Sequence, residues 1–388
     1  KAGAMARKIP AQTGATGHWA QANPLWVVTG ITLFGAALRF TLAGHRPLIF
    51  DEAMLEIIAT GPISQVLRQN AAWNSAPPLF ALTTNAILLA GNAEILLRAI
   101  PLLSSIMVIP AFYTLVRHFT GRWAAYLATL GIATALMPVY YAHYLREYSL
   151  TLLLSILILI AFLNYRTQRT RQRLIMLGAC WVISIFTQYG LALLILPLNL
   201  WLLRDAWIAW RQATKEESQR LIRWTGALQF ALLLAVGLVF ILSLRDHLQG
   251  GSFAGDSYLQ MSYWDQRPAS LPGYLIYGAL SYATFAFGAG LFGEMWEMGA
   301  ALWLTGIGAL SALLALRNTR LSLLRQLGLI TFAIALVFGL YRLFPFSGGR
   351  QTIFLSVFIF LLMGAAFEVL LAQRQRSLTA IAVIGALL

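Results

Sequence analysis

Two adjacent carboxylates stand directly after the first long apolar segment of the chain. Asp51 and Glu52 follow the apolar triplet Leu48-Ile49-Phe50. A carboxylate held beside apolar residues at a membrane boundary can have a raised pKa and act as a general base. Asp51 is also suited to cap a helix that continues through Ala53-Met54-Leu55. These residues alone leave catalysis and helix capping open.

A second polar patch, His143-Tyr144-Leu145-Arg146-Glu147-Tyr148, separates two apolar runs. Charged residues are costly near lipid, so those found there are usually functional or paired. An arginine can hold a phosphate through two parallel hydrogen bonds. A structural pair between Arg146 and Glu147, with the tyrosines at the membrane interface, explains the same pattern equally well.

Two further patches combine glycine with polar residues. Ser347-Gly348-Gly349-Arg350-Gln351 offers a backbone that a ligand can approach and a guanidinium that can meet a phosphate, although glycine turns between helices are common. Thr187-Gln188-Tyr189-Gly190 lies between two short apolar arms. Short arms leave the turn below the membrane surface, and because irregular backbone cannot be exposed to lipid, the turn is expected to line a cavity. A plain helical hairpin is the alternative.

The composition shows what must position these residues. Of the 388 residues, 59% are hydrophobic and 11% are charged, and the mean hydropathy is +0.71. Soluble domains average about 25% charged residues, so lipid is the solvent for most of this chain. Continuous apolar runs such as residues 150–163 and 227–244 favour helices over the alternating strands of a membrane barrel. We therefore predict an all-α, polytopic transmembrane helix bundle.

About 11 spans are expected in a single membrane domain over residues 25–388. They cover residues 25–43, 94–116, 123–142, 149–165, 174–188, 189–203, 225–244, 296–316, 323–344 and 352–371, with a partial run from 378. Residues 1–24 form the expected N-terminal cytoplasmic tail, in which residues 1–4 before Met5 are interpreted as a cloning remnant. The run 25–43 is long enough to remain as an anchor rather than to be cleaved as a signal peptide.

Charge fixes the expected topology. If residues 79–91 form an interfacial helix that does not cross, 19 of the 28 lysines and arginines fall on the cytoplasmic side, as the positive-inside rule requires. Ten of the 14 acidic residues then lie outside, mostly in two long external segments, 44–93 and 245–295. All four polar patches fall on this extracytoplasmic side. External juxtamembrane helices are expected in the first of these segments.

Other classes of site find little support. Cys180 is the single cysteine, which excludes an intrachain disulfide and a cysteine metal site. The net charge of +14 fits cytoplasmic loops and does not indicate nucleic acid. The histidines lack metal-ligand spacing, and phosphate-loop, nucleophile-elbow and dinucleotide motifs are missing from the sequence. We expect no cofactor, because one carboxylate pair is a poor site for a divalent metal.

In order and spacing, five motifs resemble those of the C-type (GT-C) membrane glycosyltransferases. The nearest branch is family 39, with the protein O-mannosyltransferases and the aminoarabinose transferases of lipid A. The motifs read Phe50-Asp51-Glu52-Ala53, Pro77-Pro78-Leu79-Phe80, Arg146-Glu147-Tyr148, Phe186-Thr187-Gln188-Tyr189 and Gly349-Arg350-Gln351-Thr352. Ala76, Gln188 and Gln351 depart from the pattern, which bears on substrate identity more than on reaction type.

The resemblance implies transfer of a sugar from a polyprenyl-phosphate donor to a hydroxyl of a glycan, lipid or protein acceptor, with inversion. The reaction would occur on the extracytoplasmic face of the inner (cell) membrane, in contact with membrane lipid. The implied catalytic residues are Asp51, as base, and Glu52. The implied donor-phosphate residues are Arg146, Arg350 and Tyr148, and the positive charge of the two arginines would stabilise the leaving group. The implied pocket residues are Glu147, Gln188, Tyr189, Pro77, Pro78 and His143.

Three alternatives share the fold class. A lipid or sugar transporter predicts ionisable residues near mid-membrane and symmetric halves, and neither is evident in the sequence. A polysaccharide polymerase or ligase also uses external arginines on a lipid-linked donor, but it lacks the acidic pair after the first span. A structural membrane subunit would leave Asp51 and Arg146 replaceable.

Overall fold

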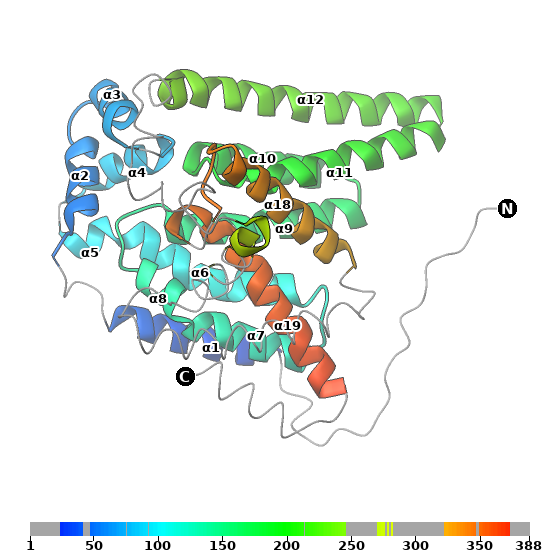
Figure 1. Cartoon of the computed structure of the whole chain (residues 1–388), viewed down its shortest axis with the longest axis horizontal. Coiled ribbons are helices and arrows are strands. Elements are labelled where there is room, and N and C mark those ends of the chain that lie inside the picture. The colour runs from blue at the N-terminus through cyan, green and yellow to red at the C-terminus, as the bar shows by residue number, and fades with distance from the viewer. Residues whose placement is uncertain are drawn as a thin grey trace.

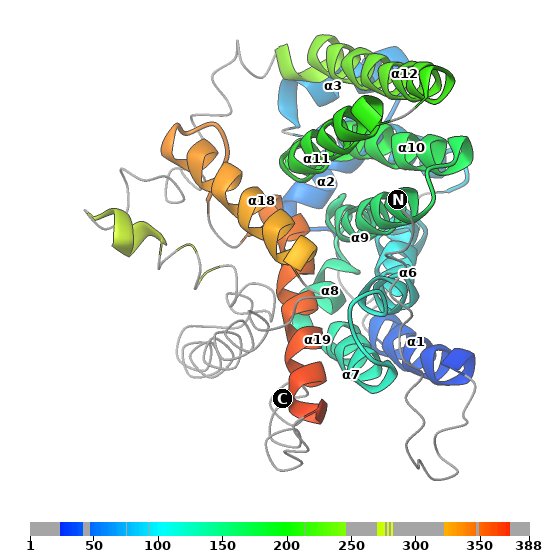
Figure 2. The same cartoon turned by 90° about the vertical axis from the view of Figure 1, so that its right-hand side faces the viewer.

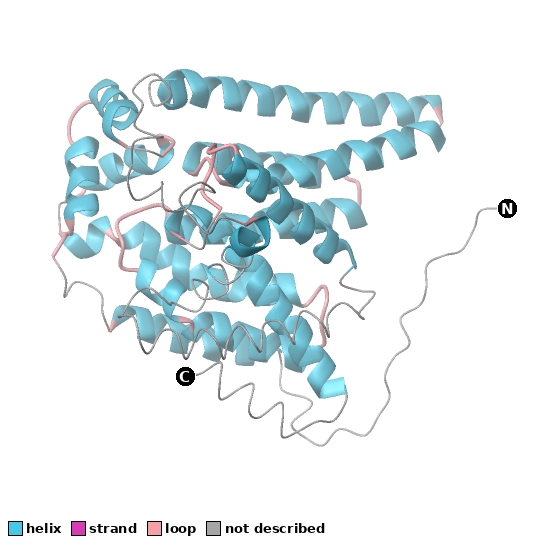
Figure 3. Cartoon of the chain, in the orientation of Figure 1, coloured by secondary structure: helices cyan, strands magenta, loops and turns pink. Residues whose placement is uncertain are grey.

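The computed structural model describes residues 24–41, 47–74, 76–91, 93–212, 214–245, 270–275, 278, 281, 322–346 and 349–372. Within these residues the chain consists of helices joined by turns, and no strand is present (Figure 3). The predicted tail, most of the segment 245–295, the predicted span 296–316 and the run from 378 lie outside the described residues.

Long helices form the body of the molecule. They are α1 (Pro24–Phe40), α6 (Ala99–Val116), α9 (Tyr148–Thr167), α10 (Arg171–Thr187), α11 (Leu191–Gln212), α12 (Lys215–Val239), α18 (Ser322–Leu340) and α19 (Ser356–Ala372). A π-helical turn, η2 (Phe240–Leu244), continues α12, and a 3₁₀ helix, η5 (Arg350–Leu355), precedes α19. Among the described residues, five helical stretches are long and apolar enough to cross a membrane. The chain is a polytopic helical membrane protein, as predicted.

These helices pack side by side. In Figure 1, α12 and α11 lie above α9 and α6, with α1 and α7 (Arg122–Thr134) below. The turned view shows α18 and α19 against one side of this row (Figure 2). Phe112 of α6 and Phe360 of α19 meet edge to face with ring centroids 6.2 Å apart, deep in the core. The core therefore joins early and late segments of the chain, which the site below requires.

Four short helices gather at one end of the bundle. They are α2 (Phe50–Ala59), α3 (Ile63–Trp73), α4 (Leu79–Leu88) and α5 (Glu94–Leu97). They bury a small core of their own, with Leu55, Ile58, Val66 and Phe80 at its centre. The ten residues of α4 rise only about 15 Å, half of a bilayer core, so α4 cannot span. The interfacial position expected for residues 79–91 remains a prediction.

One expected span is not a single helix. Residues 122–141 form two helices, α7 and α8 (Leu136–Tyr141), because Ala135 between them has a non-helical ψ of 132°. Such a break leaves backbone carbonyls without helical partners, which is costly away from water. The fully buried Arg39 donates to the carbonyl of Ala133 over 2.8 Å, and Ser105 donates to that of Pro138 over 2.7 Å. Two side chains from other helices therefore stabilise the break.

Candidate active site

The first turn of α2 carries the two adjacent carboxylates. Negative charge is favourable at a helix N-terminus, where backbone N–H groups are unpaired. Consecutive residues point about 100° apart around a helix, so the two side chains face different surroundings. Asp51 is 32% exposed, whereas Glu52 is completely buried. The pair therefore divides into one accessible and one inaccessible acid.

Asp51 contacts residues from two distant parts of the chain. Its Oδ2 forms an ion pair and hydrogen bond with Nη1 of Arg350, the first residue of η5, whose side chain is 28% exposed. The Tyr144 hydroxyl donates to the same oxygen over 3.5 Å. The structure thus brings the first and last predicted motifs together although 299 residues separate them.

Glu52 is enclosed by hydrogen-bond donors. Its Oε1 accepts from Arg98 Nε over 3.2 Å and from the backbone N–H of Leu145 over 2.7 Å. Its Oε2 accepts from Arg98 Nη2 over 3.2 Å and from the backbone N–H of Ile49 over 3.1 Å. A buried charge is tolerated when it is paired and hydrogen-bonded in this way. Glu52 therefore ties the start of α2 to the backbone next to Arg146.

Arg146 lies in the short segment between α8 and α9. Its side chain is 12% exposed and its Nε is 3.6 Å from Oε2 of Glu147, too far for a hydrogen bond. That buried Nε has no hydrogen-bond partner among the described residues. Burial lowers the pKa of Arg146, Arg350 lowers it further, and Tyr148, Glu147 and Asp51 raise it, with a net increase. Arg146 therefore remains a cation within electrostatic reach of Asp51 and Arg350.

Four tyrosines surround this segment. Ring centroids are 5.8 Å apart for Tyr141 and Tyr144, 5.9 Å for Tyr144 and Tyr148, and 6.0 Å for Tyr140 and Tyr144. Burial raises the pKa of Tyr144 to about 12, and the negative charge of Asp51 adds to the increase. The Tyr144 hydroxyl therefore keeps its proton at neutral pH and acts as a donor toward Asp51.

The turn between α10 and α11 lies against the residue that follows Arg350. Gln188 Nε2 donates to the backbone carbonyl of Gln351 over 3.1 Å. A Cβ on Gly190 would stand 3.0 Å from the same carbonyl oxygen and 2.8 Å from the rings of Phe344 and Phe354. Only glycine permits this approach. The turn is buried in protein, and it supports the segment that carries Arg350.

The remaining predicted residues occupy the surroundings. The Tyr189 hydroxyl donates to Ser243 Oγ of η2 over 2.8 Å, and Ser243 donates to the carbonyl of Ala76 over 3.5 Å. Pro77 and Pro78 follow Ala76, are buried and precede α4. His143, Glu147 and Tyr148 are buried in the segment around Arg146. No described group of three or more His, Cys, Asp or Glu side chains is placed to hold a metal.

Two site residues were not singled out from the sequence. Arg98 was counted only as one external basic residue, although a cation before an apolar span signals a buried partner. Tyr144 belonged to a recognised motif, but nothing local predicts its contact with Asp51. Both contacts join segments far apart in the chain, 46 and 93 residues respectively.

Comparison with solved structures gives this fold a precedent. The apo oligosaccharyltransferase of Archaeoglobus fulgidus superposes with a TM-score of 0.55 at 12% identity, covering 96% of this chain and 55% of that one. The archaeal oligosaccharyltransferase AglB from Archaeoglobus fulgidus, in complex with an inhibitory peptide and a dolichol-phosphate, superposes with a TM-score of 0.54 at 12% identity. The match covers 94% of this chain and 52% of that one. The chain shares its fold with the matched part of these structures.

A further structure from Archaeoglobus fulgidus, tethered to an acceptor peptide containing the NVT sequon, gives a TM-score of 0.53 at 13% identity, covering 93% of this chain and 51% of that one. The chain thus spans about half the length of each of these proteins. No protein-family model matches the chain, and neither does any curated protein sequence. At such low identity the similarity concerns the fold, and the predicted family 39 membership remains a prediction.

Proposed function

We propose that the chain is a membrane glycosyltransferase that moves a sugar from a polyprenyl-phosphate-linked donor to an acceptor hydroxyl on a glycan, lipid or protein. The observation that carries the proposal is the pairing of Asp51 with Arg350 beside Arg146, in a chain that shares its fold with part of an oligosaccharyltransferase. One of the similar structures contains a dolichol-phosphate, a donor-like lipid phosphate. The family 39 resemblance noted above suggests the monophosphate donor.

Arg146 and Arg350 are suited to hold the donor phosphate. The buried Nε of Arg146 lacks a hydrogen-bond partner among the described residues, and a phosphate oxygen would accept a hydrogen bond from it. Arg350 is partly exposed and already binds an anionic oxygen, that of Asp51. A phosphate that takes over Arg350 would release the Asp51 carboxylate. Binding of the donor phosphate to Arg350 would then also free the Asp51 carboxylate to act as the base.

The reaction can be written with these residues alone. Asp51 Oδ2 accepts the proton of the acceptor hydroxyl, whose oxygen attacks the anomeric carbon from the face opposite the phosphate. The bond between that carbon and the phosphate oxygen breaks, and the oxygen keeps the electron pair. The two guanidinium groups stabilise the negative charge of the departing phosphate. The product is an inverted glycoside, with the proton on Asp51.

The other pocket residues take supporting roles in this proposal. Gln188 Oε1 is buried with no hydrogen-bond partner among the described residues, so it is suited to accept from a sugar hydroxyl. Glu52 acts as a positioning residue rather than as a second catalytic acid, because all of its described contacts are with protein donors. We further propose that this end of the bundle faces the extracytoplasmic side of the inner membrane.

Replacing Asp51 tests the proposal. Purified full-length protein is incubated with a panel of labelled polyprenyl-phosphate sugars, and release of polyprenyl phosphate is measured. Loss of a general base costs about 10²–10⁴-fold in rate, so Asp51→Asn should lose that much and still bind donor. The matched control is Glu56→Gln, one turn further along α2, which should keep full activity. Wild-type turnover by Asp51→Asn would exclude the mechanism, and no turnover with any donor would exclude the function.

A further inference from the structure

The opposite end of α9 carries a second polar group that the proposed reaction does not use. Arg146 and Glu147 precede α9, whereas Tyr165 and Arg166 stand in its last turn and Arg169 just beyond it. The 20 residues of α9 rise about 30 Å, the thickness of a bilayer core. This second group therefore lies near the membrane face opposite Asp51.

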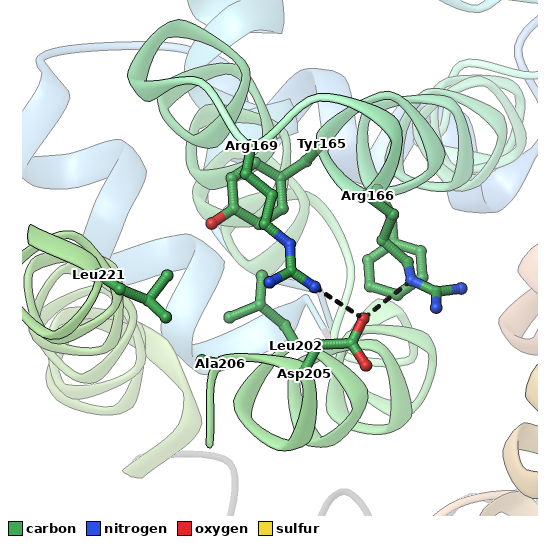
Figure 4. Close-up of a pocket in the computed structure, with 8 residues that line it drawn as sticks. Tyr165, Arg166, Arg169, Leu202, Asp205, Ala206 and Leu221 are labelled. Carbon is green, nitrogen blue, oxygen red and sulfur yellow. Dashed lines mark hydrogen bonds and ion pairs between the residues drawn. The ribbon is translucent and has the colours of Figure 1, made fainter. Parts of the chain in front are cut away.

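The group lines a pocket between α9, α11 and α12 (Figure 4). The lining combines apolar side chains, here called the floor (Phe162, Leu202 and Leu221), with charged side chains, here called the rim (Arg166, Arg169 and Asp205).

The rim carries more positive than negative charge. Arg166 Nε and Arg169 Nη2 both approach Oδ2 of Asp205, at 3.0 and 3.7 Å. One carboxylate thus serves two guanidinium groups, and one positive charge is left uncompensated within the pocket. The two arginine side chains are 32% and 42% exposed, so a ligand can reach both. An anion would complete the charge balance.

The surroundings indicate that the pocket opens at the level of the lipid headgroups. Three arginines near this end of α11 and α12 stack on tryptophan rings: Arg204 on Trp201, Arg211 on Trp207 and Arg220 on Trp224, with guanidinium-to-centroid distances of 5.5, 4.7 and 5.5 Å. Tryptophan favours the headgroup region, and arginine extends its charge to that level. Trp207 and Ile208 are exposed beside the pocket, as expected for side chains in contact with lipid.

We propose that this pocket, lined by Arg166, Arg169 and Asp205, binds the phosphate of an anionic phospholipid whose acyl chains lie along α11 and α12. Basic pockets between transmembrane helices are suited to acidic headgroups. A zwitterionic lipid would bring its own cation and gain less from the excess charge. A soluble phosphate would leave the apolar floor and the exposed tryptophans uncovered.

Lipid retention measured by native mass spectrometry tests the proposal. Full-length protein is reconstituted with phosphatidylglycerol, or with phosphatidylcholine of the same chains, and lipids that survive detergent exchange are counted. Each arginine near an anionic lipid contributes about 1 kcal/mol, or about fivefold in affinity. Arg166→Gln/Arg169→Gln should therefore retain phosphatidylglycerol about 25-fold more weakly. The control Arg171→Gln/Arg223→Gln removes the same charge from exposed positions outside the pocket lining and should match wild type.

A third variant separates lipid binding from a purely structural ion cluster. Asp205→Asn removes the competing carboxylate, so phosphatidylglycerol should bind about three- to fivefold more tightly, in line with the usual worth of a partly exposed pair. Melting temperatures confirm that each variant is folded. Four results would each overturn the proposal. They are equal retention of the two lipids by wild type, equal loss of lipid in both double variants, no gain in affinity in Asp205→Asn, and complete displacement of the lipid by inorganic phosphate.

Discussion

The buried contact between Glu52 and Arg98 allows a quantitative test of how the site is held. Glu52 is fully buried and accepts four described hydrogen bonds, two of them from the guanidinium of Arg98. Removing one partner of a buried ion pair costs about 3–5 kcal/mol, because the other charge stays buried without compensation. A glutamine at position 52 also turns one acceptor into a donor that faces other donors. We therefore expect Glu52→Gln to lower the free energy of unfolding by about 3 kcal/mol or more.

Arg98 supplies a matched control within the same contact. Its Nη1 also lies 3.6 Å from Glu94, whose side chain is 41% exposed. Solvent-exposed pairs of this kind contribute about 0–1 kcal/mol. Glu94→Gln should therefore unfold almost as wild type does. The comparison keeps the chemistry of the substitution and the arginine constant, and changes the burial of the glutamate and the number of its hydrogen bonds.

The double variant completes a thermodynamic cycle. Glu52→Gln/Arg98→Gln places two amides where the ions were, and amides can hydrogen-bond to each other. The double variant should therefore lose less free energy of unfolding than the sum of the two single variants, by at least about 1.5 kcal/mol. Unfolding is followed by circular dichroism in mixed micelles, and activity by polyprenyl phosphate release. Glu52→Gln should also lose activity, since the weakened contacts of residue 52 with Arg98 and the Leu145 N–H hold the adjacent Arg146 less firmly. Additive costs, or equal costs for Glu52→Gln and Glu94→Gln, would refute the reasoning.

Two further predictions concern the same region. Tyr144→Phe should lower turnover less than about tenfold, because its 3.5 Å contact with Asp51 is a weak hydrogen bond. It should leave the pH profile between about pH 6 and 10 unchanged, because a phenol with a pKa of about 12 stays protonated there; a profile that shifts with this substitution would contradict the assignment. Gly190→Ala should cost about 1–3 kcal/mol by crowding Gln351 and two phenylalanine rings. Gly226→Ala, whose Cβ meets no atom within 4 Å, should be neutral or stabilising; equal melting temperatures for the two alanine variants would refute the crowding.

The helical membrane fold was predictable from the sequence because it depends on local properties. A low charge content and continuous apolar runs are sufficient to require helices in lipid. The same runs located α6, α9 and α19 within a few residues. Segment 123–142 is two helices instead of one, because hydropathy does not report a backbone break at Ala135. Pro138 is a local signal for that break, because it has no N–H to pair with the carbonyl of Thr134. The support from Arg39 and Ser105 comes from other helices, and no local pattern indicates it.

The sequence indicated some of the candidate site residues, but not Arg98 and not the geometry of the site. The sequence indicated Asp51, Arg146 and Arg350 as candidate site residues, since charged side chains beside apolar runs are costly without a role. The local residue pattern did not distinguish Asp51 from Glu52, which are neighbours in the chain, and only the family resemblance implied Asp51 as the base. Their separate roles follow from helix geometry and packing, because one carboxylate points toward Arg350 and the other toward Arg98 in the protein interior.

The sequence by itself determined that this chain lies in lipid, that it is helical, and which polar residues are too costly to be incidental. Only the tertiary structure decided which of those residues meet: the ion pair of Asp51 with Arg350, and the shared Asp205 at the far end of α9. The physical reason is the distance along the chain over which each kind of interaction acts. Hydropathy and helical periodicity act over a few turns of one helix, whereas a contact across 299 residues depends on how whole helices pack.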